Sequence, residues 1–147
     1  MRFPGLLLAL ALALLAGCAH DSTAELIPGV RLGMSPRDVR DRFDPSGAGA
    51  WQTKIGGGPG ATDDTVLEWT ATGEGARATS ARFEFHLGML VAIRAHLREP
   101  VAAERVELTP KVVTVRSPQA GGSDVSVLAR DCPTHHEEAE SLASRAR

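Results

Sequence analysis

Residues 81–98 read ARFEFHLGMLVAIRAHLR and carry the clearest β pattern in the chain. Apolar and polar residues alternate on both sides of Gly88, as expected for two strands that each bury one face. Both apolar rows must face one core, and a one-residue slip would turn one row to solvent. We therefore predict a hairpin with a three-residue loop at 88–90, or an equivalent bulge. The loop pairs Leu87 with Val91, Phe85 with Ile93, and Glu84 with Arg94, the last as an ion pair.

Shorter patterns outside this hairpin predict the rest of a sheet. Alternating residues indicate strands at 51–55, 66–70 and 124–130. Pro110 interrupts residues 105–115, which predicts edge strands or one bent strand, because proline donates no ladder hydrogen bond. The expected fold class is α+β, with an antiparallel sheet of four to six strands and two short helices packed on one face.

Both helices have recognisable start signals. Ser35 is a natural N-cap and Pro36 suits the first helical position, while Pro45 ends this helix by about residue 44. Near the C-terminus, Thr134 and Glu137 have the spacing of a capping box. We therefore predict one helix of about two turns after Ser35 and a second helix after Thr134.

The N-terminus has the pattern of a secretory leader. Arg2 precedes an apolar run at 6–16, which is shorter than the roughly 20 residues that span a bilayer. The residues Leu15-Ala16-Gly17-Cys18 resemble the lipobox of bacterial lipoproteins, where the leader is cut before an acylated cysteine. We expect a signal peptide at 1–17, lipidated Cys18 and a tether at 18–27, and one domain at 28–147. The alternative is an ordinary cleaved leader with a chance cysteine.

Lipidation of Cys18 would fix the location of the domain and the state of the second cysteine. Two or more acyl chains hold a protein stably in a membrane. An aspartate directly after the lipidated cysteine often retains a lipoprotein at the inner membrane. This chain has Ala19 at that position, which favours the outer membrane, facing the periplasm. Cys132 then has no partner in the chain and is a buried small hydrophobe, an intermolecular partner or a reactive thiol. Without acylation, a disulfide between Cys18 and Cys132 becomes possible.

Two motifs resemble a known family. The helix start LGMSPRDV at 32–39 and the later Phe85, Gly88 and Leu90 are similar to the SmpA/OmlA domain. The resemblance covers about residues 27–98, and FDPSG at 43–47 replaces the family's usual Leu-Gly-x-Pro. It implies a small outer-membrane lipoprotein that assists β-barrel insertion, with a fold related to β-lactamase inhibitory proteins.

Composition and motifs argue against several function classes. The 18 acidic and 16 basic residues form no block of like charge, so nucleic-acid binding is not expected. The chain has no Gly-x-Ser-x-Gly elbow and no phosphate-binding loop, so we predict no enzyme and no cofactor. The predicted function is a non-catalytic binding or envelope-assembly accessory with an unknown protein partner. Met34, Trp51 and the glycine-rich loop at 56–60 are candidate partner contacts, although each is better explained as structural.

Two alternatives stay open. Cys132, His135 and His136 lie within DCPTHHEE at 131–138 and could form a thiol-responsive or metal-responsive site, although the spacing matches no standard zinc motif. The third hypothesis is an inhibitor-like domain that presents the open face of its sheet to an enzyme. An exposed aromatic side chain on that face would favour it.

Overall fold

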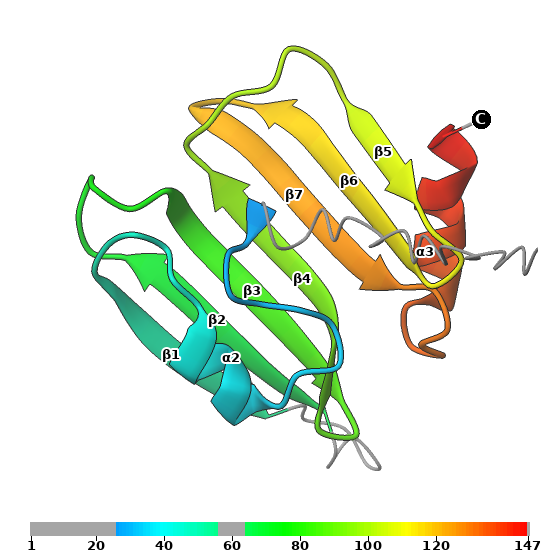
Figure 1. Cartoon of the computed structure of the whole chain (residues 1–147), viewed down its shortest axis with the longest axis horizontal. Helices are drawn as coiled ribbons and strands as arrows, with labels where there is room; N and C mark the ends of the chain where they lie inside the picture. The colour runs from blue at the N-terminus through cyan, green and yellow to red at the C-terminus, as the bar shows by residue number, and fades with distance from the viewer. Residues whose placement is uncertain (1–25, 56–63, 147) are drawn as a thin grey trace, which may run out of the picture.

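The computed structural model describes residues 26–55 and 64–146, so the predicted leader and Cys18 lie outside the described residues. Within these ranges one antiparallel sheet has the strand order β1-β2-β3-β4-β7-β6-β5 (Figure 1). The strands are β1 Gly49–Ile55, β2 Thr65–Ala71, β3 Ala78–His86, β4 Met89–Leu97, β5 Arg105–Leu108, β6 Val112–Gln119 and β7 Gly122–Ala129. The helices are α2 Pro36–Arg42 and α3 His136–Ala143, and a 3-10 turn at Ser144–Ala146 follows α3. The α+β class is confirmed, with seven strands where four to six were predicted.

The central hairpin has the predicted faces but not the predicted register. A two-residue turn joins β3 to β4, and both its residues, Leu87 (φ 50) and Gly88 (φ 75), have the positive φ of tight hairpin turns. The extra residue is Val91, which lies between the partners of Phe85 and Glu84 as a bulge. The bulge alternative is therefore confirmed. The three-residue loop is wrong, and so are the three pairings predicted from it, Leu87 with Val91, Phe85 with Ile93 and Glu84 with Arg94.

The observed register still turns both apolar rows inward. Phe83 lies opposite Ile93, and Phe85 lies opposite Leu90. The pairing of Phe83 with Ile93 is displaced by two residues from the predicted one, and an even displacement leaves these side chains on the same face. On the turn side of the bulge the displacement is three, so Leu90 takes the buried position that was predicted for Val91. Leu87 also departs from the predicted row, because its position in the turn leaves it 61% exposed.

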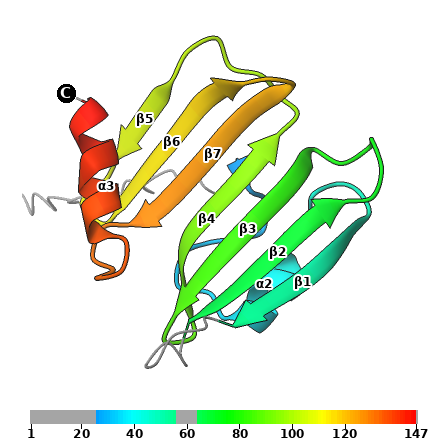
Figure 2. The ribbon, with the colours of Figure 1, turned by 180° about the vertical axis from the view of Figure 1, so that it is seen from behind.

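The two helices cover opposite faces of the sheet (Figures 1 and 2). Val39 of α2 belongs to the cluster that contains Ile93, whereas Ala139 of α3 belongs to the cluster that contains Ala92. Ala92 and Ile93 are consecutive on β4 and therefore point to opposite faces. The predicted placement of both helices on one face is wrong, since the centre of the sheet is apolar on both sides, as Val127 and Leu128 of β7 also show.

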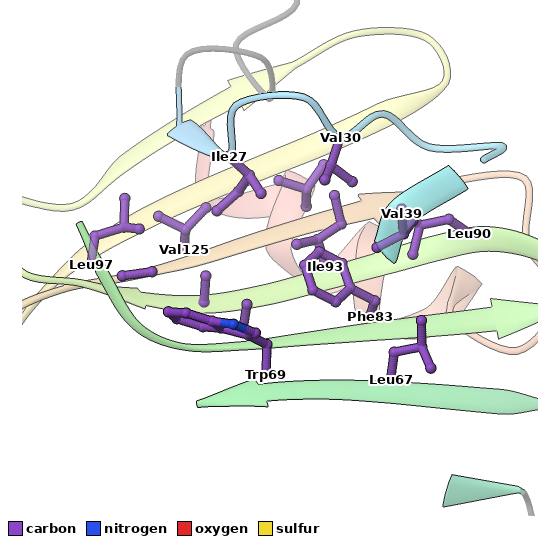
Figure 3. Close-up of a cluster of buried hydrophobic side chains, with 14 of the residues drawn as sticks. Ile27, Val30, Val39, Leu67, Trp69, Phe83, Leu90, Ile93, Leu97 and Val125 are labelled. Carbon is purple, nitrogen blue, oxygen red and sulfur yellow. The ribbon is translucent and has the colours of Figure 1, made fainter. Parts of the chain in front are cut away.

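The larger core lies on the α2 face of the sheet. Figure 3 shows it with the labelled side chains Ile27, Val30, Val39, Leu67, Trp69, Phe83, Leu90, Ile93, Leu97 and Val125. Ile27 is 1% exposed and Val30 is fully buried, so the segment before α2 is part of the domain. The tether was predicted to run to residue 27, but the folded domain includes Ile27. Full burial of one such apolar side chain contributes about 1.5–3 kcal/mol to the stability of the folded state.

The ends of the elements partly follow the sequence signals. Ser35 caps α2, and Asp38 completes a capping box. The N-cap of α3 is His135 without a side-chain cap bond, so the prediction of Thr134 as the cap is wrong. A turn closed by the His135 N–H on the Cys132 carbonyl (3.1 Å) moves the helix start by one residue.

The region around Pro110 forms two strands rather than one bent strand. β5 is an edge strand, as predicted, while β6 lies inside the sheet between β5 and β7. Pro110 falls between the two strands, where no ladder donor is needed. Over the described ranges, neither helix has the length and apolar character needed to cross a membrane.

Candidate functional site: the open face and the start of α3

The face of the sheet that carries α3 is only partly covered. α3 packs on β5, β6 and β7 and leaves the same face of β1 to β4 without a covering helix (Figure 2). We call this uncovered part the open face. A cleft of about 430 Å³ lies on it, over β2, β3, β4 and β7. Its polar lining residues are Glu68, Thr70, Ser80, Arg82, Arg94, His96, Asp124 and Ser126.

Charges of alternating sign cross the open face from β1 to β4. Glu68 on β2 lies 2.6 Å from Lys54 on β1 and 2.7 Å from Arg82 on β3. The hydrogen bond from Lys54, followed by the weaker effect of Arg82, holds the pKa of Glu68 below its usual value. Glu84 then joins Arg82 to Arg94, with 3.1 Å from its carboxylate to each Nε atom. The open face therefore carries many charges, but its positive and negative charges nearly cancel. Exposed ion pairs of this kind each contribute about 0–1 kcal/mol to the stability of the fold.

Glu84 is the most buried carboxylate of this row. Its side chain is 17% exposed, and its Oε2 atom lies 3.0 Å from Nε2 of His135. The hydrogen bond from His135 is the largest cause that lowers the pKa of Glu84 to about 2, with further lowering by Arg82 and Arg94 against the opposing effect of burial. The predicted ion pair between Glu84 and Arg94 is present, although the two residues are not directly opposite.

His135 connects Glu84 to Cys132. The Nδ1 atom of His135 lies 3.7 Å from the Cys132 Sγ atom, while Nε2 faces Glu84. Chiefly through the hydrogen bond to Glu84, the pKa of His135 is raised to about 9, so the imidazole is protonated at neutral pH. Cys132 is 5% exposed and His135 is 8% exposed.

The thiol of Cys132 is more acidic than an ordinary cysteine. Burial has the largest single effect and raises its pKa, but hydrogen bonds from His135 and Thr134 together lower it further than burial raises it. The structure therefore aligns Cys132, His135 and Glu84 in one row from the start of α3 to β3. Of the three predicted thiol or metal residues, it brings Cys132 and His135 together.

His136 takes no part in this row. Its Nδ1 atom lies 2.9 Å from the carbonyl oxygen of Arg130, and its side chain is exposed at the first position of α3. Over residues 26–55 and 64–146, no group of three or more His, Cys, Asp or Glu side chains is arranged to hold a metal ion. The metal-binding form of the alternative therefore has no ligand set in the part of the chain that is described.

The two predicted partner contacts, Met34 and Trp51, pack on the α2 face. Both are half-buried against the main core. The Trp51 ring centroid lies 5.7 Å from that of Phe43 in an edge-on contact, and the guanidinium carbon of Arg40 lies 5.5 Å from the Trp51 centroid. These contacts give Trp51 a structural role. The glycine-rich loop at 56–60 lies outside the described residues.

The described aromatic side chains gather on one side of the sheet. Phe43, Trp51, Trp69, Phe83 and Phe85 all lie in the main core or against it. In the described part of the chain, the open face therefore has no aromatic side chain. This distribution counts against the inhibitor-like alternative, which an exposed aromatic residue on that face would have favoured.

Sequence reasoning found Cys132, His135 and the ion pair of Glu84 with Arg94, but it missed the contact that joins His135 to Glu84. The open face had a visible signal, because Arg82, Glu84 and Arg94 occupy polar positions of alternating strands. Such positions are typical of any solvated face. Nothing local links His135 to Glu84, because 51 positions separate them.

Comparison with known proteins found no matching family model, no matching curated relative and no matching solved structure. The resemblance to the SmpA/OmlA domain therefore stays a prediction.

Proposed function

We propose that this chain is a lipid-anchored envelope protein whose domain binds a protein partner on the open face, without catalysis. The observation that carries the proposal is the unequal covering of the sheet. On the α2 face, helix α2 and the segment before it cover an apolar core. The open face instead has a polar cleft of about 430 Å³. The leader and Cys18 supply the expected location at the outer membrane.

The charges of the open face favour a particular kind of partner. Cations and carboxylates alternate there, so a partner with both signs of charge can exchange contacts with Lys54, Glu68 and Arg82. Paired charges of this kind contribute to specificity more than to affinity. A nucleic acid requires a surface of predominantly positive charge, which these pairs do not provide. We infer a folded protein surface with mixed charges.

Cross-linking in the native cell envelope tests the proposal. A photoreactive amino acid at Thr70, which is exposed and lines the cleft, is compared with one at Arg37, whose side chain is 90% exposed on α2. We expect a discrete cross-linked product from Thr70 and none from Arg37. Equal products from both positions, or none from Thr70, would contradict the binding role of the open face.

A pair of substitutions provides an independent test. Thr70→Arg places a long side chain in the cleft, whereas Thr72→Arg changes an exposed residue just after β2 that does not line the cleft. We expect Thr70→Arg to weaken recovery of the partner identified by cross-linking at least tenfold. Thr72→Arg should leave recovery unchanged, and both variants should keep the wild-type unfolding temperature. Equal recovery with both variants would count against the proposal.

A further inference from the structure

A second built site lies where α3 begins. Cys132, His135 and Glu84 form a row with 3.7 Å between Sγ and Nδ1 and 3.0 Å between Nε2 and the carboxylate. The site differs from the open-face cleft, because neither Cys132 nor His135 lines that cleft. A thiol beside an imidazole that a carboxylate orients is an arrangement that activates a nucleophile.

The charges around His135 determine where the protons lie. The Glu84 carboxylate accepts a hydrogen bond from the Nε2–H group of His135. A second proton, on Nδ1 of His135, then makes the ring an imidazolium. The nearby charged groups are Glu84 and Arg82 on β3, Arg94 on β4 and Glu138 on α3. Arg82 and Arg94 both donate to the Oε1 atom of Glu84, and Arg94 is also paired with Glu138 at 2.8 Å, so the Oε2 atom of Glu84 is left to accept from His135. Burial raises the pKa of the Cys132 thiol, but hydrogen bonds from His135 and Thr134 lower it further, so the thiolate forms more readily beside the imidazolium than in an ordinary cysteine.

We propose that Cys132 is a peroxide-reactive thiol for which His135 supplies the proton and Glu84 holds the imidazole in place. The Sγ thiolate attacks the terminal oxygen of a hydroperoxide, so that an S–O bond forms and the O–O bond breaks. The leaving alkoxide or hydroxide takes the Nδ1 proton of His135. The products are a cysteine sulfenic acid, a neutral imidazole and an alcohol or water. Sulfur is oxidised and the peroxide is reduced by the same two electrons.

Burial limits the oxidant to a small molecule. Cys132 is 5% exposed and His135 is 8% exposed, so little of the thiol is accessible to a large reagent. Hydrogen peroxide is close to water in size, whereas an aromatic disulfide reagent is much larger. The site is therefore selective for small hydroperoxides.

The chain provides no obvious second thiol to resolve the product. It contains two cysteines, and the other is Cys18, which the leader predicts to be acylated. The sulfenic acid is therefore the expected product, rather than an intramolecular disulfide. Reactivity of this thiol does not depend on partner binding, so the two proposals fail separately.

The wild-type protein provides the first test. Full-length protein purified in detergent is exposed to hydrogen peroxide, and the sulfenic acid at Cys132 is trapped with a dione reagent and quantified by peptide mass. At pH values below its pKa, an unperturbed thiol reacts about tenfold faster for each unit by which the pH rises, because the thiolate fraction rises in that proportion. We expect the rate between about pH 6 and 8 to rise less steeply than tenfold per pH unit, and reaction with an aromatic disulfide to be at least tenfold slower than after unfolding. A rate that rises about tenfold per unit, or equal access for the aromatic disulfide, would overturn the proposal.

Matched histidine variants provide the second test. We expect His135→Gln to slow sulfenic acid formation about tenfold at neutral pH and to restore a steep rise of rate with pH. His136→Gln, at the adjacent exposed position, should react like the wild type, and circular dichroism establishes that both variants are folded. Equal rates in the two variants would exclude a role for His135. If His135→Gln does not fold, the wild-type pH profile alone decides.

Discussion

At the scale of single residues, Glu84 determines much of the chemistry at the start of α3. Its carboxylate receives hydrogen bonds from Arg82, Arg94 and His135, which belong to two strands and to the segment before α3. A half-buried carboxylate with three cationic donors stays ionised over almost the whole accessible pH range. His135 is held protonated in turn, with its pKa raised to about 9. Glu84 thereby links the C-terminal segment to the middle of the sheet.

Replacement of Glu84 should lower stability in a manner that depends on pH. Because the pKa of His135 is raised from 6.5 to about 9, its contribution is complete below about pH 6.5 and is lost as pH rises through 9. Because the pKa of Glu84 is lowered from 4.5 to about 2, its contribution is complete above about pH 4.5 and is lost as pH falls through 2. We expect Glu84→Gln to reduce the free energy of unfolding by about 1.5–3 kcal/mol near pH 6, measured by urea titration. The difference from wild type should shrink toward pH 9.5.

Glu107→Gln is the control for this experiment, because Glu107 is exposed on the edge strand β5. It should change the free energy of unfolding by less than about 0.5 kcal/mol at every pH. A Glu84→Gln effect as large at pH 9.5 as at pH 6 would show that the His135 contact does not contribute.

At the scale of elements, helix α2 depends on its cap. The Ser35 Oγ atom accepts a hydrogen bond from the Asp38 N–H at 3.2 Å, and the Asp38 carboxylate in turn accepts from Ser35. We expect Ser35→Ala to lower the free energy of unfolding by about 1 kcal/mol. Ser141→Ala, at an exposed position inside α3, should be neutral or stabilising by up to about 0.5 kcal/mol. Thermal unfolding compares the two, and equal effects would exclude a specific role for the cap.

The packing of β7 on β4 requires a glycine at 122. A Cβ atom added to Gly122 would lie 1.8 Å from the backbone oxygen of Leu97, and backbone cannot move away as a flexible side chain can. We therefore expect Gly122→Ala to destabilise the domain by about 1–3 kcal/mol or more. Gly73→Ala is the control, since nothing lies within 4 Å of its added Cβ. Comparable urea midpoints for the two variants would contradict this close approach.

The sequence patterns predicted which side chains of a strand are buried more reliably than they predicted turns and strand pairing. Except next to the turn, where Leu90 takes the position predicted for Val91, the alternation in 81–98 identified which side chains of β3 and β4 point to the main core, because strand periodicity is local. It did not identify the two-residue turn at Leu87 and Gly88, because two solutions bring the apolar residues of both strands to one face. One is a three-residue loop, and the other is a two-residue turn followed by a bulge at Val91. The position of α3 was also missed, because its apolar patch combines β4, β6 and β7 and exists only in the assembled sheet. For the same reason the sequence suggested Cys132 and His135 but could not supply Glu84.

At the scale of the whole molecule, the α2 face of the sheet carries the larger apolar core, whereas the opposite face is apolar under α3 and polar over the open face. Leu26 and Ile27, where the described chain begins, pack on the α2 face. The proposed tether from Cys18 would therefore reach the domain on the side opposite the open face. Leu26 lies eight positions after Cys18, and a chain of eight residues reaches at most about 26–29 Å when extended. With the proposed anchor, the domain would lie near a bilayer while its open face stays accessible to a partner.

Attachment of the domain to a membrane through Cys18 is tested most directly by the intact mass of the protein isolated from its native cells. We predict a chain that begins at Cys18 and is heavier than residues 18–147 by the mass of two or three acyl chains. A Cys18→Ser variant should lose this mass and leave the membrane fraction. A chain without added lipid mass, or one that retains residues 1–17, would contradict the anchored location.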